Sequence, residues 1–374
     1  MCGVGHPNTS SQHDSSSSIP AHASSSLVNL LIDTHCHPTD DPSVYTLGNN
    51  DNISSLSDRI AVSPVAKFVC MSTNARDQTL VAQLALLQPT RVIPCFGWHP
   101  WFTHHISLLH PAPSKNDHYH TLFGTTSSPR YKEELESIWD DLPEPISLET
   151  VLAGIEENFN RFPQALLGEV GIDRAFRIPR KPWDYNPHSH THSDSALPKL
   201  TKLKTPPQHQ LTILQSQLSL ALTHKRNVSL HTVQAAGLTT TLLSHLKHTS
   251  ISSFGAIRIS LHSCTLDNNV IKSILKQHKN IYIGFSSSIN HKQILDKSCL
   301  AQVDMHQVLV ESDHHTVKEM EGCLVRANEY FANLHGLKAE DAAKQLRRNW
   351  QTFYGTMLDK GSESSDEVED QDGV

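Results

Sequence analysis

The sequence predicts an α/β protein of the (β/α)8 TIM-barrel type. Eight short β-rich apolar segments alternate with segments in which apolar residues recur at helical spacing. Strict alternation of this kind favours parallel strands joined by right-handed crossovers. The chain has 374 residues, and such a barrel uses about 250. The length therefore accommodates one closed barrel together with tails and insertions.

The predicted strands are apolar runs that end at a turn or at a polar residue. In chain order they are residues 27–33, 66–72, 91–97, 165–170, 227–230, 257–261, 281–285 and 307–310. The predicted helices show 3.6-residue periodicity. Between strands they are residues 77–87, 148–159, 209–224, 237–247 and 268–278, and after the last strand they are residues 317–334 and 339–357.

We expect one folded domain over residues 27–358, with disordered ends. Residues 1–26 are rich in Ser and His and have too little apolar surface to order themselves. Residues 359–374 form an acidic tail that we also expect to be disordered. Two stretches with little periodicity, at about 103–144 and 177–207, follow the third and fourth strands. Loops of this length are usually functional or disordered, so we interpret them as loop insertions.

The net charge and the cysteine pattern argue against some classes of protein. The net charge is −7, and the acidic tail supplies most of it, so the body of the chain is close to neutral. This argues against a protein that coats duplex DNA, but not against an enzyme that takes one strand end. The seven cysteines are scattered in mostly apolar runs, as in reduced intracellular proteins.

The sequence shows no pattern typical of a membrane span or of a targeting segment. The sequence has no apolar run of 18 residues, so no transmembrane helix or membrane partner is expected. Residues 1–26 contain no Lys or Arg, which argues against a secretory signal and an Arg-rich transit peptide. A cytoplasmic or nuclear location, or both, is the expectation.

A pair of histidines stands at the end of the first predicted strand, in the run Asp33-Thr34-His35-Cys36-His37. Side chains two positions apart in an extended segment point to the same side. His35 and His37 can therefore face one metal ion. Because the chain contains 26 histidines, a surface pair at this spacing is the alternative. The position directly after a strand favours ligation.

Further imidazoles and carboxylates follow later strands: Glu169, Asp173, His231, His262, Glu311 and Asp313. In an α/β barrel the carboxyl ends of all strands meet on one face, where the chemistry is placed. Four histidines, one glutamate and one aspartate are enough ligands for two divalent ions, with the glutamate as a bridge, and such a pair can activate water. Singly, each residue also fits a structural role, such as a helix N-cap for Asp313.

Together the motifs resemble the TatD family of metal-dependent deoxyribonucleases, within the amidohydrolase-like barrel superfamily, and its eukaryotic or fungal branch in particular. The resemblance covers about residues 31–355. The motifs that carry it are Asp33-Thr34-His35-Cys36-His37, Gly97-Trp98-His99-Pro100, Gly168-Glu169-Val170-Gly171-Ile172-Asp173, His231, His262, Glu311-Ser312-Asp313 and the closing Arg348-Asn349-Trp350-Gln351-Thr352-Phe353-Tyr354.

The resemblance implies a role for each matching residue. His35, His37 and Asp313 would bind one ion, His231 and His262 the other, and Glu169 would bridge them, with Asp313 and Glu169 as the catalytic residues. His99 would lie near the substrate phosphate; the alternative is a strand-end histidine packed between Trp98 and Trp101. Imidazoles favour Zn²⁺, and carboxylates with open water sites suit Mg²⁺ or Mn²⁺, so the metal is left open.

The resemblance also implies a phosphodiesterase of the 3′–5′ exonuclease type, with a single strand or 3′ end of DNA as substrate. Three segments depart from the family pattern: Thr232-Val233-Gln234 replaces an X-Arg pair, Ser263-Cys264-Thr265-Leu266 replaces Cys-Phe-Ser/Thr-Gly, and His314-His315 replaces a proline. Two alternatives therefore stay open. One is hydrolysis of a small amide or ester, and the other is a barrel kept as a scaffold that contacts a protein partner through its insertions or tail.

Overall fold

The computed structural model describes residues 25–45, 51–124, 128–180, 200–290, 300 and 303–355. Apart from Ser25 and Ser26, the two ends that were predicted to be disordered lie outside these residues. Ser25 and Ser26 belong to a short helix, α1 (Ser25–Val28), so the prediction was wrong for those two residues. The second insertion is described at residues 177–180 and 200–207 only.

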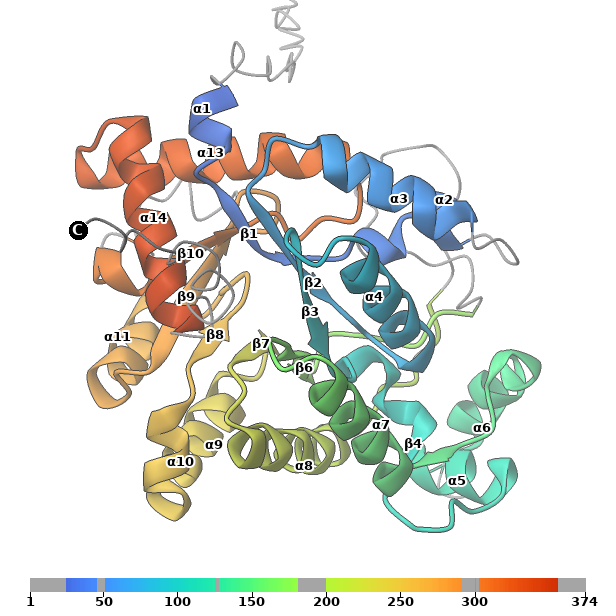
Figure 1. The fold of residues 1–374 in the computed structure, drawn as a ribbon. Helices are drawn as coiled ribbons and strands as arrows, with labels where there is room; N and C mark the ends of the chain where they lie inside the picture. Colours follow the sequence, from blue (N-terminus) through green and yellow to red (C-terminus); the bar gives the residue numbers. More distant parts are fainter. Residues whose placement is uncertain are drawn as a thin grey trace, which may run out of the picture.

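Eight parallel strands form one sheet, as the sequence predicted. They are β1 (Ile32–Cys36), β2 (Lys67–Met71), β3 (Val92–Phe96), β6 (Leu166–Asp173), β7 (Val228–Val233), β8 (Ile259–Leu261), β9 (Ile281–Ser286) and β10 (Val308–Glu311). They pair in chain order from β1 to β10, and Figure 1 shows the helices arranged around them. The TIM-barrel fold class is therefore confirmed.

The first and last strands lie side by side and nearly close the barrel. The backbone N–H of Asp313 donates to the carbonyl of His35 (3.0 Å), and the N–H of His37 donates to the carbonyl of His314 (2.8 Å). The Thr34 hydroxyl donates to the carbonyl of Val310 at 3.0 Å. These bonds place the end of β10 directly beside the His-X-His segment.

The barrel interior is a packed core. Alternate strand residues such as Val69, Ile93 and Leu309 point inward, and Trp350 and Phe353 of the last helix pack against them. A second, larger apolar cluster lies between the strands and the surrounding helices. Because both faces of each strand are covered, the strands are apolar along almost their whole length, as is usual for parallel sheets.

The helices after most strands match the predicted periodicity to within a few residues. The helices are α2 (Pro42–Tyr45), α3 (Asp51–Val62), α4 (Ala75–Leu87), α5 (Lys115–Leu122), α6 (Pro129–Glu136), α7 (Leu148–Arg161), α8 (Pro207–His224), α9 (Ala236–Thr249), α10 (Ile251–Ala256), α11 (Asn268–Gln277), α13 (Val317–His335) and α14 (Ala339–Tyr354). The 3-10 turns are η1 (Pro38–Asp40), η2 (Pro100–His105), η4 (Trp139–Asp141) and η7 (Met305–Gln307).

Residues 103–144, interpreted from the sequence as a loop insertion, contain regular secondary structure. This stretch contains α5, α6 and η4, and its strand β4 (Ile106–Ser107) pairs in parallel with β5 (Ile146–Ser147). It has an apolar core that it shares with the second insertion. The core consists of Tyr119, Phe123, Leu135, Ile138 and Leu142 from the first stretch and Ile178 and Leu203 from the second. The two insertions therefore pack together as one unit, seen at the lower right of Figure 1.

Several strand boundaries also differ from the prediction. The first strand begins at Ile32 rather than at residue 27, β6 continues to Asp173, and β7 continues to Val233. The strands are longer at their carboxyl ends because neighbouring parallel strands extend the hydrogen-bond ladder past the last apolar residue. As a result His35 and His231 lie within strands rather than in the loops after them, whereas Glu169 lies within its strand as predicted.

Candidate metal centre

All six predicted metal ligands converge at the carboxyl ends of the strands. His35 comes from β1, with His37 just after it; Glu169 comes from β6 and His231 from β7. His262 directly follows β8 and Asp313 lies two residues after β10. All six side chains are at most 8% exposed. Residues almost 280 positions apart in the sequence thus share one buried site, as the barrel prediction required.

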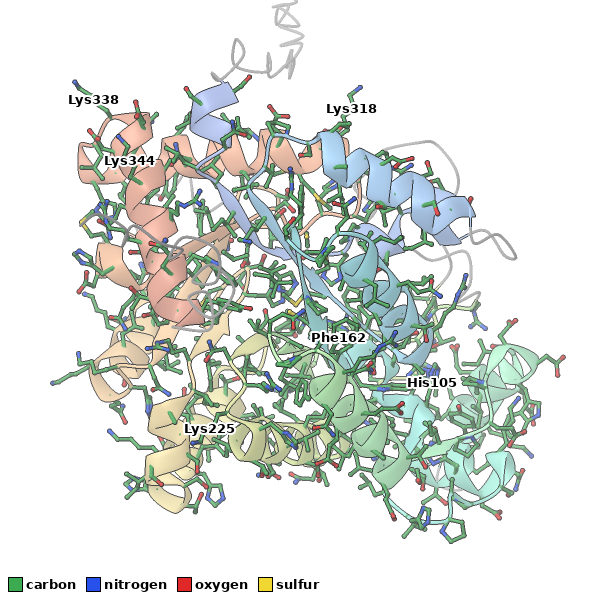
Figure 2. The ribbon with its side chains drawn as sticks, viewed as in Figure 1. His105, Phe162, Lys225, Lys318, Lys338 and Lys344 are labelled. Atoms are coloured by element: carbon green, nitrogen blue, oxygen red, sulfur yellow. The ribbon has the colours of Figure 1, made fainter. Side chains whose placement is uncertain are left out.

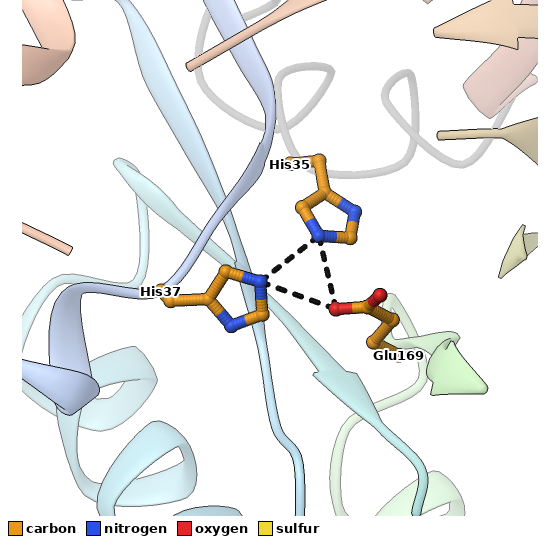
Figure 3. A group of neighbouring side chains, drawn as sticks. All are labelled: His35, His37 and Glu169. Atoms are coloured by element: carbon orange, nitrogen blue, oxygen red, sulfur yellow. Dashed lines mark hydrogen bonds and ion pairs between the residues drawn. The ribbon is translucent and has the colours of Figure 1, made fainter. Parts of the chain in front are cut away.

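The first donor group consists of His35, His37 and one carboxylate oxygen of Glu169 (Figure 3). The Nε2 atoms of the two histidines are 3.0 Å apart, and each lies 3.2 Å from Oε2 of Glu169. Oδ1 of Asp313 lies 3.7 Å from Nε2 of His35 and 3.6 Å from Nε2 of His37. Four donor atoms therefore surround one small volume.

This donor group fits a metal ion. Two ligands at tetrahedral angles around zinc lie about 3.4 Å apart, close to the observed separations. A hydrogen bond between the facing nitrogens of His35 and His37 needs a proton on one of the two rings, whereas a metal ion contacts both nitrogens and the carboxylate oxygen at once. Oε2 of Glu169 is buried and accepts no hydrogen bond from the described residues. An ion at this point would satisfy these donors together.

The second donor group uses the other oxygen of Glu169. Oε1 lies 2.7 Å from Nδ1 of His231 and 2.7 Å from Nε2 of His262. These two nitrogens are 3.0 Å from each other. Glu169 thus presents one oxygen to the β1 histidines and the other to the β7 and β8 histidines, which is the arrangement expected of a bridging carboxylate.

His99 lies in the same cluster. Its Nε2 is 3.1 Å from Oε1 of Glu169 and 3.3 Å from Nδ1 of His231, so it is a further candidate ligand of the second group. Its Nδ1 accepts the backbone N–H of Trp101 at 3.2 Å, and the Trp101 ring packs edge-on against it. The predicted role near a substrate phosphate and the predicted packing role are both compatible with this position.

The protonation states of the histidines in the cluster depend on their contacts with carboxylates, above all Glu169. Burial favours the neutral acid, but the surrounding imidazoles outweigh it and lower the pKa of Glu169. Burial likewise opposes protonation of His37 and His231, yet contact with carboxylates raises their pKa values to about 9 and about 10. For His35, burial and the neighbouring His262 lower the pKa to about 3. Without an ion, the protons on His37 and His231 balance the negative charge of the Glu169 carboxylate.

Two buried side chains hold the ligands in orientation. The Ser229 hydroxyl lies 2.7 Å from Nδ1 of His35, and Oδ2 of Asp173 lies 3.3 Å from Nε2 of His231. Partners of this kind fix the tautomer and ring angle of a metal-bound histidine. Asp173 stands in the Gly168–Asp173 motif, and no role was predicted for it. Strand alternation, which places residues 169, 171 and 173 on one face, was a signal that could have found it.

Glu311 supports the centre without belonging to either donor group. It accepts hydrogen bonds from the backbone N–H and the hydroxyl of Ser263, and burial raises its pKa to about 8. The Ser263 hydroxyl is also 2.8 Å from Oδ2 of Asp313. Ser263 and Asp313 have φ values of 39° and 51°, in the left-handed region that residues other than glycine rarely adopt. Such backbone strain is typical of functional sites.

The family departure after His231 lines a cleft beside the site. Thr232, Val233 and Gln234 line a cleft with a volume of about 830 Å³. Lys318, a lysine close to Asp313 in the sequence, is exposed and extends outward from α13 (Figure 2). It therefore does not supply the positive charge that the family pattern places after the fifth strand.

Within the described residues, no helix is long and apolar enough to cross a membrane.

Comparisons with known proteins agree with the fold and the motifs. The chain is 28% identical over 356 residues to the Cut9-interacting protein scn1 of Schizosaccharomyces pombe, covering 86% of this chain and 98% of that protein. It is 26% identical over 295 residues to the uncharacterized deoxyribonuclease YMR262W of Saccharomyces cerevisiae, covering 77% and 84%.

Solved structures share the fold. YJJV, a TatD homologue from Escherichia coli, matches with a TM-score of 0.54 at 18% identity over 87% of this chain and 98% of that one. An uncharacterized amidohydrolase from Saccharomyces cerevisiae matches with a TM-score of 0.54 at 11% identity, covering 86% and 99%. The family model for TatD related DNase matches residues 32–355. The chain therefore belongs to the TatD-related DNase family of metal-dependent hydrolases.

Proposed function

We propose that the chain is a phosphodiesterase that removes nucleotides from the 3′ end of single-stranded DNA with the help of two divalent ions. The observation that supports this best is the division of Glu169 between two donor groups, with His35 and His37 on one oxygen and His231 and His262 on the other. Centres that hold two ions a short distance apart are common in enzymes that cleave phosphodiesters.

The residues present would hold the ions in two sets. His35, His37 and Asp313 would form one set, His231 and His262 the other, and Glu169 would belong to both. When bound, such ions supply a water of lowered pKa and offset the negative charge of the phosphoryl oxygens. The mixture of four imidazoles and two carboxylates accommodates Zn²⁺, Mn²⁺ or Mg²⁺.

Asp313 would act as the proton acceptor. Its Oδ2 accepts the Ser263 hydroxyl at 2.8 Å, which fixes the carboxylate plane, and its Oδ1 faces His35 and His37. A carboxylate held at that point can take a proton from a water that lies between the two donor groups. His99, 3.1 Å from Glu169, would bind either an ion or a phosphoryl oxygen.

A nuclease assay with a matched variant tests this proposal. Protein loaded separately with Mg²⁺, Mn²⁺ or Zn²⁺ should release mononucleotides from single-stranded DNA labelled at the 5′ end, leaving a ladder of shortened strands. Glu169→Gln should lower the rate by at least about 100-fold. Glu134→Gln, a buried glutamate that pairs with Arg180 in the insertion unit, serves as the control and should keep the wild-type rate.

The same assay includes an amide and a lactone substrate. Turnover of either one without turnover of any phosphodiester would overturn the phosphodiesterase proposal and favour a small-molecule hydrolase. Release from the 5′ end would overturn the proposed direction of attack alone.

A second candidate function is a binding role in which the barrel serves as a scaffold. It is supported by the name of the Schizosaccharomyces pombe relative, a Cut9-interacting protein, and by exposed apolar side chains on the insertion unit. These are Leu108, Leu109 and Tyr131, which are 44%, 65% and 41% exposed. Cellular rescue separates the two candidates: a scaffold tolerates Glu169→Gln and loses function when Leu109 and Tyr131 are both replaced by Ser.

A further inference from the structure

A cleft opens beside the candidate metal centre, at the carboxyl ends of three neighbouring strands. Its volume is about 830 Å³. Its walls are Arg174, which follows β6, the segment from Thr232 to Leu238 after His231, and the segment from Thr265 to Asp267 after His262. The cleft therefore borders the second donor group through the residues that follow two of its histidines.

Arg174 is the single cationic side chain among the residues that line this cleft, all of which the structure describes. It is exposed, and its Nη1 donates to the backbone carbonyl of Gln234 at 3.2 Å. No carboxylate of the described residues lies within 4.0 Å of its guanidinium. At least one of its five N–H donors is thus used in this contact, and no described carboxylate forms an ion pair with its charge.

The position of Arg174 is fixed from both sides. Its backbone N–H donates to the carbonyl of Val233 (3.1 Å), and its own carbonyl accepts the Lys204 ammonium group (2.8 Å). Asp173, the residue before it, contacts His231. An anion held by Arg174 would therefore lie at a defined place relative to the metal centre.

A second wall of the cleft also favours an anion. Helix α9 begins there, at Ala236, and Ala235 at its N-cap position makes no side-chain hydrogen bond to the first turn. The first three residues of the helix line the cleft. Exposed N–H groups at a helix start and the positive end of the helix dipole attract phosphate. The one acid of the cleft, Asp267, accepts the N–H of Asn269 at the start of α11.

We propose that Arg174 binds a backbone phosphate of a single-stranded nucleic acid, next to the phosphate that is cleaved at the metal centre. The proposal rests on the proposed phosphodiesterase function. A guanidinium suits this ligand because its planar fork donates two parallel hydrogen bonds to phosphate oxygens. Arg174 is a positioning residue here: it would hold the strand and would leave the chemical step to the metal centre.

Arg174→Ala tests the proposal, with Arg347→Ala as the matched control. Arg347 also donates to a backbone carbonyl at 3.2 Å, that of Asn29, but Asn29 precedes β1 and so lies at the opposite end of the barrel. Binding of a short phosphorothioate DNA strand to the metal-loaded protein is measured over a range of salt concentrations. Arg174→Ala should weaken binding about 10- to 100-fold and reduce the salt slope by about 0.7. Arg174→Lys should restore the slope and part of the affinity.

A second substrate separates this proposal from the proposed function. Hydrolysis of bis(p-nitrophenyl) phosphate, which has no neighbouring phosphate, should proceed equally in wild type and Arg174→Ala, while KM for the DNA strand rises in the variant. Failure of wild type to cleave either phosphodiester would overturn the proposed function, yet the binding measurement would still decide the role of Arg174. Unchanged affinity and salt slope in Arg174→Ala, as in Arg347→Ala, would overturn the present proposal.

Discussion

Asp173 and His231 form the contact that joins the candidate metal centre to its surroundings. Oδ2 of Asp173 lies 3.3 Å from Nε2 of His231, and the opposite ring nitrogen, Nδ1, lies 2.7 Å from Oε1 of Glu169. The indole N–H of Trp101 donates to the same Asp173 oxygen at 2.7 Å. The imidazole is thus held between two carboxylates, and one of them is itself oriented by a hydrogen bond.

Asp173→Asn should weaken metal binding without preventing folding. The amide keeps the shape of the side chain but removes the charge that fixes the His231 ring, and loss of such a partner typically lowers metal affinity about 10- to 100-fold. Metal titration followed by calorimetry measures the change. Asp117→Asn, an exposed acid in the first turn of α5 in the insertion unit, is the control. Equal affinity in wild type and Asp173→Asn would show that the contact does not orient a ligand.

Metal binding should release protons at neutral pH. Contact with carboxylates raises the pKa values of His37 and His231 to about 9 and about 10 despite their burial, so both are protonated in the metal-free protein at pH 7. An ion must displace those protons, and affinity should therefore rise as the pH rises towards those values. Calorimetric enthalpies measured in buffers with different ionisation enthalpies give the number of protons released. An enthalpy that does not depend on the buffer would contradict this prediction.

The barrel and the convergence of the six candidate ligands could be predicted because both depend on local patterns. Each strand is a short apolar run, and each ligand stands at or just after the end of one. The exact strand ends could not be predicted, because the ladder between β6 and β7 extends to Asp173 and Val233 through pairing between distant segments. Strand alternation places Asp173 on the same face as Glu169, but its partner His231 is identified only once the two strands are aligned.

Gly171→Ala should disrupt the centre through the backbone. A Cβ at Gly171 would lie 2.1 Å from the carbonyl oxygen of His231, so β6 and β7 would have to separate. We expect a loss of about 1 to 3 kcal/mol in the free energy of unfolding, together with weaker metal binding. Gly154→Ala is the matched control, since a Cβ there meets no atom within 4 Å in the interior of α7. Chemical denaturation should show Gly154→Ala to be as stable as wild type or more stable, by up to about 1 kcal/mol.

Acid should destabilise the insertion unit through His104. This side chain is 4% exposed, and burial, with the adjacent His105, lowers its pKa well below its usual range. Because the unfolded chain binds a proton near pH 6.5 and the folded one does not, stability is lost as the pH falls below that value. His104→Gln should therefore lose less stability than wild type between pH 7.5 and pH 5.5, measured by urea denaturation. An equal loss of stability in His104→Gln and in wild type would contradict the prediction.

The helices of the first insertion could not be predicted from local patterns. Residues 103–144 have little periodicity, because α5 and α6 are eight residues each and bury only a few side chains. Their core is completed by Ile178 and Leu203 from the second insertion. Because the apolar contacts of this unit come from two separated segments, neither segment alone shows enough helical periodicity to predict its helices.

The central claim is that Glu169 bridges two metal ions. Anomalous diffraction from crystals soaked separately in Mn²⁺ and in Zn²⁺ tests it most directly. The account predicts two peaks about 3.5 to 4 Å apart, one beside His35 and His37 and the other beside His231 and His262, with the Glu169 carboxylate between them. A single peak, or two peaks that do not share Glu169, would contradict it.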